Sequence, residues 1–159
     1  MKYILFVVLF VAFEVTHAQS LPAYDEIVLE KSTDYKPANQ SALAAANYIL
    51  SKPIANKDLD YLKSLKFMIK WMSGTPDYMF DIDAEVGKLV KGSDALVGVY
   101  MAAMTKYCLE HPDTKDDQEA IKKNSLNTLI EYCENPANNV KMNRALRRLA
   151  DEKRVSKSV

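Results

Sequence analysis

The sequence predicts an all-α fold: a single bundle of five or six antiparallel helices with an extended N-terminal arm. Apolar residues recur at steps of three and four through most of the chain after residue 38, which is the spacing of one helix face. Proline and glycine fall where these stretches end, as at Pro53 and Gly74. The connections are short, which favours antiparallel neighbours.

Composition supports one globular domain. The 159 residues include 21 Lys and Arg and 21 Asp and Glu, so the formal net charge is zero. Apolar residues at 48% and charged residues at 26% are values of a folded domain. A neutral chain lacks the basic excess of a nucleic-acid binder, and two cysteines are too few for a disulfide scaffold. No nucleic-acid partner is therefore expected.

The first 18 residues have the pattern of a secretory signal peptide. Lys2 precedes an apolar run over residues 3–13, and Thr16 and Ala18 occupy the small-residue positions of a cleavage site. We therefore expect an exported protein, periplasmic or secreted, whose chain begins at Gln19. No later stretch holds 18 apolar residues, so no transmembrane segment is expected.

The domain organisation follows from the next segments. Residues 19–38, which contain Pro22 and Pro37, are expected to form the irregular arm, and residues 39–152 the helical bundle. An Ala-rich helix over residues 41–50 ends before Pro53. The next helix is expected to begin at the N-cap Asn56 and to end at Gly74. Its predicted core face consists of Leu59, Leu62, Leu65, Ile69 and Met72.

Three more helices are expected between residues 81 and 134. Asp81 is the predicted cap of a short helix that Gly92 closes, and Ser93 caps the next. Residues 95–105 carry no charge, which predicts a helix buried at the centre of the bundle. Asp113 or Thr114 is the predicted cap of the helix that runs to about residue 134. Its predicted inward side chains are Ile121, Leu126, Leu129, Ile130 and Cys133.

The last helix is expected to begin at Pro136, and residues 153–159 to form a disordered basic tail. Its predicted core side consists of Val140, Met142, Ala145, Leu146 and Leu149. Residues 48–53 also resemble residues 107–112, which indicates either a duplicated hairpin or two helices that end alike.

Three stretches carry a family resemblance: WMSGTPDY at residues 71–78, GVYMAAMTKY at 98–107 and YCENP at 132–136. In these stretches the chain resembles a group of small exported all-α proteins of Bacteroidetes-type bacteria. The resemblance covers most of the chain after the signal peptide. It implies a periplasmic or secreted setting and brings no mechanism with it.

Few residues suggest catalytic or metal chemistry. The segment with Asp77, Asp81, Asp83 and Glu85 fits an acidic first turn of a helix, although it shares part of the spacing of a calcium loop. Cys108 and Cys133 are expected near the ends of successive helices, too far apart to bridge, and therefore as free buried thiols. No nucleophile, phosphate-loop or dinucleotide motif is present. We expect no enzyme, no metal and no cofactor.

Two surface features suggest interaction instead. Lys141, Arg144 and Arg148 form a basic stripe opposite the apolar side of the last helix, which suits an acidic envelope protein or an anionic surface, or is simply a solvated face.

Aromatic side chains gather around a predicted turn at residues 74–76. Trp71, Tyr78 and Phe80 there are either core residues or a contact site. The two surface features together predict a non-enzymatic exported interaction or envelope-associated module. The alternative is a carrier of a small apolar ligand or lipid in a helical cavity. The oligomeric state is left open.

Overall fold

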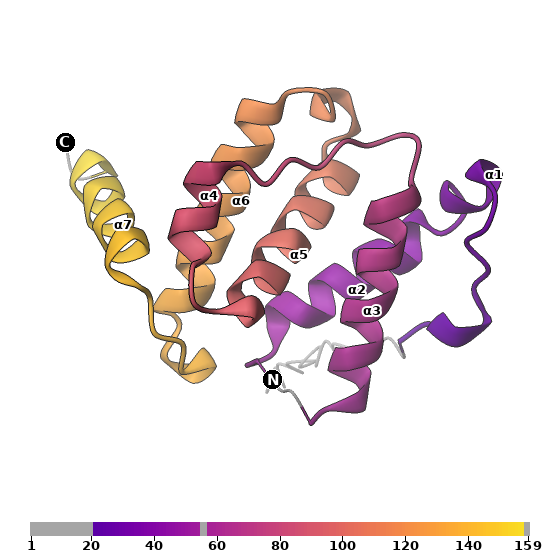
Figure 1. Cartoon of the computed structure of the whole chain (residues 1–159), viewed down its shortest axis with the longest axis horizontal. Coiled ribbons are helices and arrows are strands. Elements are labelled where there is room, and N and C mark those ends of the chain that lie inside the picture. Colours follow the sequence, from indigo (N-terminus) through magenta and orange to yellow (C-terminus); the bar gives the residue numbers. More distant parts are fainter. Residues whose placement is uncertain (1–20, 55–56, 158–159) are drawn as a thin grey trace, which may run out of the picture.

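The computed structural model describes residues 21–54 and 57–157, and this part of the chain is all-helical, which confirms the predicted fold class (Figure 1). The predicted signal peptide and the predicted cap Asn56 lie outside the described residues. The α-helices are α1 Ser32–Tyr35, α2 Asn39–Ser51, α3 Leu59–Gly74, α4 Ala84–Val90, α5 Asp94–Glu110, α6 Gln118–Glu134 and α7 Arg144–Lys157. Three 3-10 turns accompany them: η1 Tyr24–Glu26, η2 Pro112–Thr114 and η3 Pro136–Asn138. The count exceeds the prediction because α1 is a single turn within the arm.

Helix α5 is the centre of the bundle, as its uncharged stretch predicted. It contacts α2, α3, α4 and α6, and it forms an antiparallel hairpin with α6 (Figure 1). Ser93 caps α5, because its hydroxyl accepts a hydrogen bond from the amide of Leu96 at 3.3 Å. Gly98 lets α3 approach closely, since a Cβ atom there would lie 3.1 Å from Cδ1 of Leu65. Several of the fully buried side chains, among them Tyr100 and Met104, lie on this helix.

The predicted core face of α3 is wrong at three of its five positions. Leu59 is 71% exposed, and Leu62 and Ile69 are 40% and 38% exposed. The buried side of the helix is rotated from the predicted one and consists of Tyr61, Ser64, Phe67, Met68, Trp71 and Met72, of which Met72 was predicted. Both sides of α3 carry apolar residues at helical spacing, and the side with the larger aromatic side chains is the one that is buried, because it removes more apolar area from water.

Three helix starts also differ from the prediction. Asp58 caps α3, accepting from the amides of residues 60 and 61 at 2.9 and 3.2 Å. Asp83, and not Asp81, caps α4, and Asp117, and not Asp113 or Thr114, caps α6. Each segment holds several aspartates, and packing selects which of them begins the helix. Gly92, with φ of 87°, follows the end of α4 as predicted.

Helix α7 begins eight residues later than expected. After η3, Asn139 adopts a left-handed conformation with φ of 48°, which turns the chain away from the helix direction. Asn143 then caps α7 by accepting from the amide of Leu146 at 2.9 Å. The helix continues to Lys157, so most of the expected disordered tail is helical. Leu146 and Ala150 are buried, whereas Ala145, expected inside, is exposed.

The N-terminal arm packs on α3. Tyr24 and Tyr35 are buried, and the ring of Tyr24 stacks on Phe67 with centroids 4.8 Å apart. Nε1 of Trp71 donates to the backbone carbonyl of Tyr35 at 3.3 Å. The arm and α7 therefore lie at opposite sides of the molecule, with the bundle between them (Figure 1).

Candidate functional site

The aromatic residues around residues 74–76, predicted as either core residues or a contact site, form a core cluster. Trp71 is fully buried, and its ring centroid lies 5.6 Å from that of Tyr78 and 5.9 Å from that of Phe80. Tyr78 and Phe80 are half-buried and cover it. Trp71 therefore cannot meet a partner at the surface, and the prediction of a binding role for it is wrong: its large indole is buried by packing between the arm and the α3–α4 loop.

The acidic segment before α4 is occupied by structural contacts. Nζ of Lys122 on α6 lies 2.7 Å from Asp83 and 2.6 Å from Glu85, so the three residues join α4 to α6. This ammonium group, together with the amide of Val86, lowers the pKa of Asp83, and the two carboxylates raise the pKa of Lys122. Across residues 21–54 and 57–157, no group of three or more His, Cys, Asp or Glu side chains is placed to hold a metal ion.

Both cysteines are free and buried, as predicted. Burial raises the pKa of Cys108 to about 12 and that of Cys133 to about 11. Thiols of this kind are poor nucleophiles, because the thiolate is the reactive form. His111, three residues after Cys108, is exposed, and its Nδ1 lies 3.0 Å from the carbonyl oxygen of Tyr107. The Cys108–His111 pair thus has the wrong environment for covalent catalysis.

The three residues of the predicted basic stripe are all exposed, but they lie at the opposite end of the helix from that expected. Lys141 precedes α7, and Arg144 and Arg148 lie in its first two turns together with Arg147. The predicted start at Pro136 would have placed these cations late in the helix, where the dipole favours them. At the N-terminal end the dipole opposes them. The predicted favourable placement of these cations late in the helix is therefore wrong, although they are exposed to solvent.

A second helix brings more cations to the same place. The side-chain amide of Asn143 donates to the carbonyls of Lys88, Leu89 and Lys91, at 3.1, 2.8 and 3.3 Å. The C-terminal end of α4 therefore meets the N-terminal end of α7. Six exposed cations surround this junction, which we name the basic corner: Lys88, Lys91, Lys141, Arg144, Arg147 and Arg148.

Most cations of the basic corner form no ion pair with an acidic side chain of the described residues. Within the described part of the chain, Arg148 is its one member with an acidic partner in ion-pair distance, Glu152 at 2.8 Å. That Lys88 and Lys91 join this cluster could not be predicted from the sequence, because they lie more than 50 positions before Asn143. The one available signal was Asn143 itself, a good N-cap residue just ahead of the apolar Leu146 and Leu149.

A groove adjoins the basic corner, between α6 and α7. It has a volume of about 350 Å³, and we name it the α6–α7 groove. Its apolar lining is Cys133, Val140, Met142 and Ala150, and its charged lining is Glu134, Lys141, Arg147, Asp151 and Arg154. Arg154 is already paired with Glu134, at 2.6 Å, and with Asp151. Lys141 and Arg147 remain available at the groove, so it can accept an apolar group that is accompanied by a negative charge.

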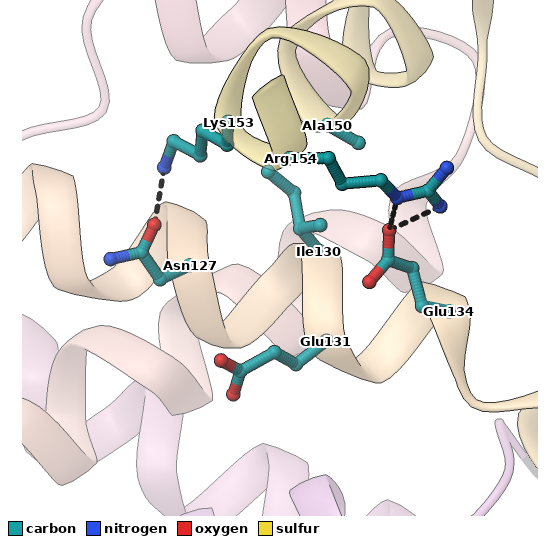
Figure 2. Close-up of a pocket in the computed structure, with 7 residues that line it drawn as sticks. All are labelled: Asn127, Ile130, Glu131, Glu134, Ala150, Lys153 and Arg154. Atoms are coloured by element: carbon teal, nitrogen blue, oxygen red, sulfur yellow. Dashed lines mark hydrogen bonds and ion pairs between the residues drawn. The ribbon is translucent and has the colours of Figure 1, made fainter. Parts of the chain in front are cut away.

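Helix α7 packs on α6 through a small apolar contact, which has a hydrogen-bonded pair of polar side chains on each side. Figure 2 shows Ile130 of α6 projecting toward α7, with Lys153 bonded to Asn127 on one side and Arg154 bonded to Glu134 on the other. The buried Ala150 lies on the facing side of α7. These two pairs hold α7 against α6, and they therefore also position the side of the α6–α7 groove that α7 forms.

Comparison of the chain with protein-family models, curated proteins and solved structures finds no match. The search for a membrane-crossing helix in the described residues also finds none of sufficient length and apolarity. The basic corner is a surface of Arg and Lys side chains beside the partly apolar α6–α7 groove, and this chemistry is suited to binding anions.

Proposed function

We propose that this protein is a non-enzymatic, exported interaction module that binds an acidic partner through the basic corner. The observation that carries the proposal is the meeting of α4 and α7 at Asn143, which collects six exposed cations. Five of them have no acidic partner among the described residues.

Stability accounts for only part of this arrangement. Lys88 and Lys91 lie at the C-terminal end of α4, where the dipole favours cations, but Arg144 and the other arginines of the basic corner lie at the N-terminal end of α7, which is positive and disfavours them. Like charges gathered on one surface also repel one another. An acidic partner removes both penalties when it binds, and Arg side chains can engage its carboxylates through two parallel hydrogen bonds.

The exported setting is part of the proposal. Its support is the basic start, the apolar run and the small residues ending at Ala18. Fractionating the cells and sequencing the N-terminus of the recovered protein tests it: a chain outside the cytoplasm that begins at Gln19 supports export, and a cytoplasmic chain that retains Lys2 contradicts it.

Binding is tested with a triple variant, Lys141→Gln, Arg144→Gln and Arg148→Gln. Association with immobilised polyglutamate, followed by biosensor, should slow on the order of tenfold at low salt, because surface charges act mainly on the rate of encounter. The difference should shrink as salt rises and the Debye length falls below about 8 Å. Native mass spectrometry on the same protein tests the alternative, since a co-purifying lipid or small apolar ligand would favour a carrier.

A matched control replaces three exposed lysines at the other side of the molecule, Lys36, Lys66 and Lys70, by Gln. It changes net charge by the same amount and should leave the association rate nearly unchanged. Equal slowing by both variants would show that net charge alone, and not the basic corner, governs binding.

A further inference from the structure

The end of the molecule away from the basic corner is acidic. The α3–α4 loop and the α5–α6 turn lie side by side there, because Nζ of Lys115 donates to the carbonyl of Asp77 at 3.2 Å and Gln118 donates to the carbonyl of Met79 at 3.3 Å. Both segments run along the upper side of the molecule in the view of Figure 1. Five carboxylates of these segments, together with Glu119 in the first turn of α6, form what we name the acidic end: Asp77, Asp81, Asp113, Asp116, Asp117 and Glu119.

None of these carboxylates forms an ion pair within residues 21–54 and 57–157. An apolar side chain stands among them, since Met79 is 70% exposed and the neighbouring Ile82 is 39% exposed. The acidic end is therefore not a uniform solvated surface. It presents a flexible thioether side chain surrounded by negative charge.

The two charged surfaces are complementary and point in different directions. Helix α4 begins beside the acidic end and finishes at the basic corner, so the length of α4 separates them (Figure 1). The chain as a whole has a formal net charge of zero, so no overall repulsion opposes the approach of two copies.

We propose that a second copy of this chain is the acidic partner: the acidic end of one copy docks on the basic corner of the next, with Met79 in the α6–α7 groove. The inference rests on the proposed function, because it names the partner of the same basic surface. In this contact the carboxylates around Met79 meet Lys141 and Arg147, the available cations of the groove. The thioether side chain, which adapts to irregular spaces, meets the apolar lining of Val140 and Met142.

The contact joins two different surfaces, so it is heterologous, and a pair of copies keeps one free surface of each kind: a basic corner on one copy and an acidic end on the other. Such contacts build rings if the rotation closes and open chains if it does not. Assembly should therefore depend on concentration and on salt, and it should stop when either surface is removed.

Sedimentation of the chain that begins at Gln19, which retains every described residue, tests the proposal. At low salt the sedimentation coefficient should rise with protein concentration, and it should return to the monomer value near 1 M salt, where the Debye length is about 3 Å. Two triple variants should each remain monomeric: Lys141→Gln, Arg144→Gln and Arg147→Gln at the basic corner, and Asp81→Asn, Asp113→Asn and Asp116→Asn at the acidic end. Asp117 is left in place because it caps α6.

A mixture of the two variants gives the decisive outcome. The first retains the acidic end and the second retains the basic corner, so together they should form a one-to-one pair and nothing larger. A symmetric interface, in which the same surface is used twice, would give no such pair. Adding Met79→Ala to the first variant should weaken the pair about tenfold or more, whereas Leu59→Ala, at an equally exposed position on α3, should not.

A further control neutralises three other carboxylates, Glu26→Gln, Glu30→Gln and Asp60→Asn, and should leave self-association intact. A chain that stays monomeric at every concentration in low salt would overturn the self-association proposal. If that chain still binds polyglutamate through the basic corner, the proposed function stands without it; if it does not, both fall together.

Discussion

Gly74, at the end of α3, offers a sharp test of how the arm packs on the bundle. A Cβ atom at this position would lie 1.9 Å from Oη of Tyr35, 2.4 Å from Cζ and 2.7 Å from Cε1. The ring of Tyr35 is buried, and its backbone carbonyl holds the indole of Trp71. Glycine is required here for space, because the arm crosses α3 where a side chain would stand.

The magnitude follows from these distances. Gly74→Ala must displace a packed ring, and overpacking of this kind costs about 1–3 kcal/mol of the free energy of unfolding. Gly87→Ala, in α4, meets nothing within 4 Å and should raise the free energy of unfolding by about 0.5–1 kcal/mol, because alanine favours the helix. Gly98→Ala meets only the end of the flexible Leu65 side chain, at 3.1 Å, and should fall between the two.

Urea unfolding of the three variants measures this order. A double-mutant cycle with Tyr35→Ala isolates the cause, since the cost of Gly74→Ala should disappear when the ring is absent. The described packing of the arm would be refuted if Gly74→Ala unfolded with the same free energy as the wild type. It would also be refuted if Gly74→Ala lowered the free energy of unfolding as much in the Tyr35→Ala background as in the wild type.

Three further predictions concern buried and titrating groups. Thr105→Val removes a fully buried hydroxyl that has no hydrogen-bond partner among the described residues, and it should raise the free energy of unfolding in urea by about 1 kcal/mol. Ser93→Ala, which removes the α5 cap, should lower it by about as much. Burial raises the pKa of Cys108 and Cys133, so a thiol reagent at neutral pH should label both cysteines quickly in the unfolded protein and slowly in the native protein. Fast labelling of the native protein would contradict their burial. The amides of Glu30 and Lys31 lower the pKa of Asp34, so its contribution to stability is complete above about pH 3.9 and is lost as pH falls through the folded pKa. Thermal unfolding of Asp34→Asn between about pH 2 and 7 should therefore show a weaker loss of stability in acid than the wild type, and an identical decline would contradict the assignment.

The helical class and the central position of α5 could be read from the sequence, because both depend on local pattern: a period near 3.6 and an uncharged stretch over residues 95–105. The orientation of α3 could not. Leu59, Leu62 and Ile69 repeat at helical spacing just as Tyr61, Met68 and Trp71 do, so periodicity alone leaves two possible core faces. The choice between them depends on which neighbours fill the space, and that is a property of the tertiary structure.

The candidate site shows the same division. Lys141, Arg144 and Arg148 were visible as a basic stripe, since they lie close together in the sequence. Their position at the beginning of α7 depended on Asn139 turning the chain, and the addition of Lys88 and Lys91 depended on α4 ending beside Asn143. Contacts between residues more than 50 positions apart have no signal in a single sequence.

Asn143 also couples the motions of two helices. Its amide oxygen closes the first turn of α7, while its amide nitrogen closes the last turn of α4. An aspartate could serve the first role but not the second, because a carboxylate has no donor and would place a negative charge at the negative end of α4. Fraying of these two ends is therefore a single cooperative event: in native-state amide hydrogen exchange, the start of α7 and the last turn of α4 should open with the same free energy, and Asn143→Asp should separate them.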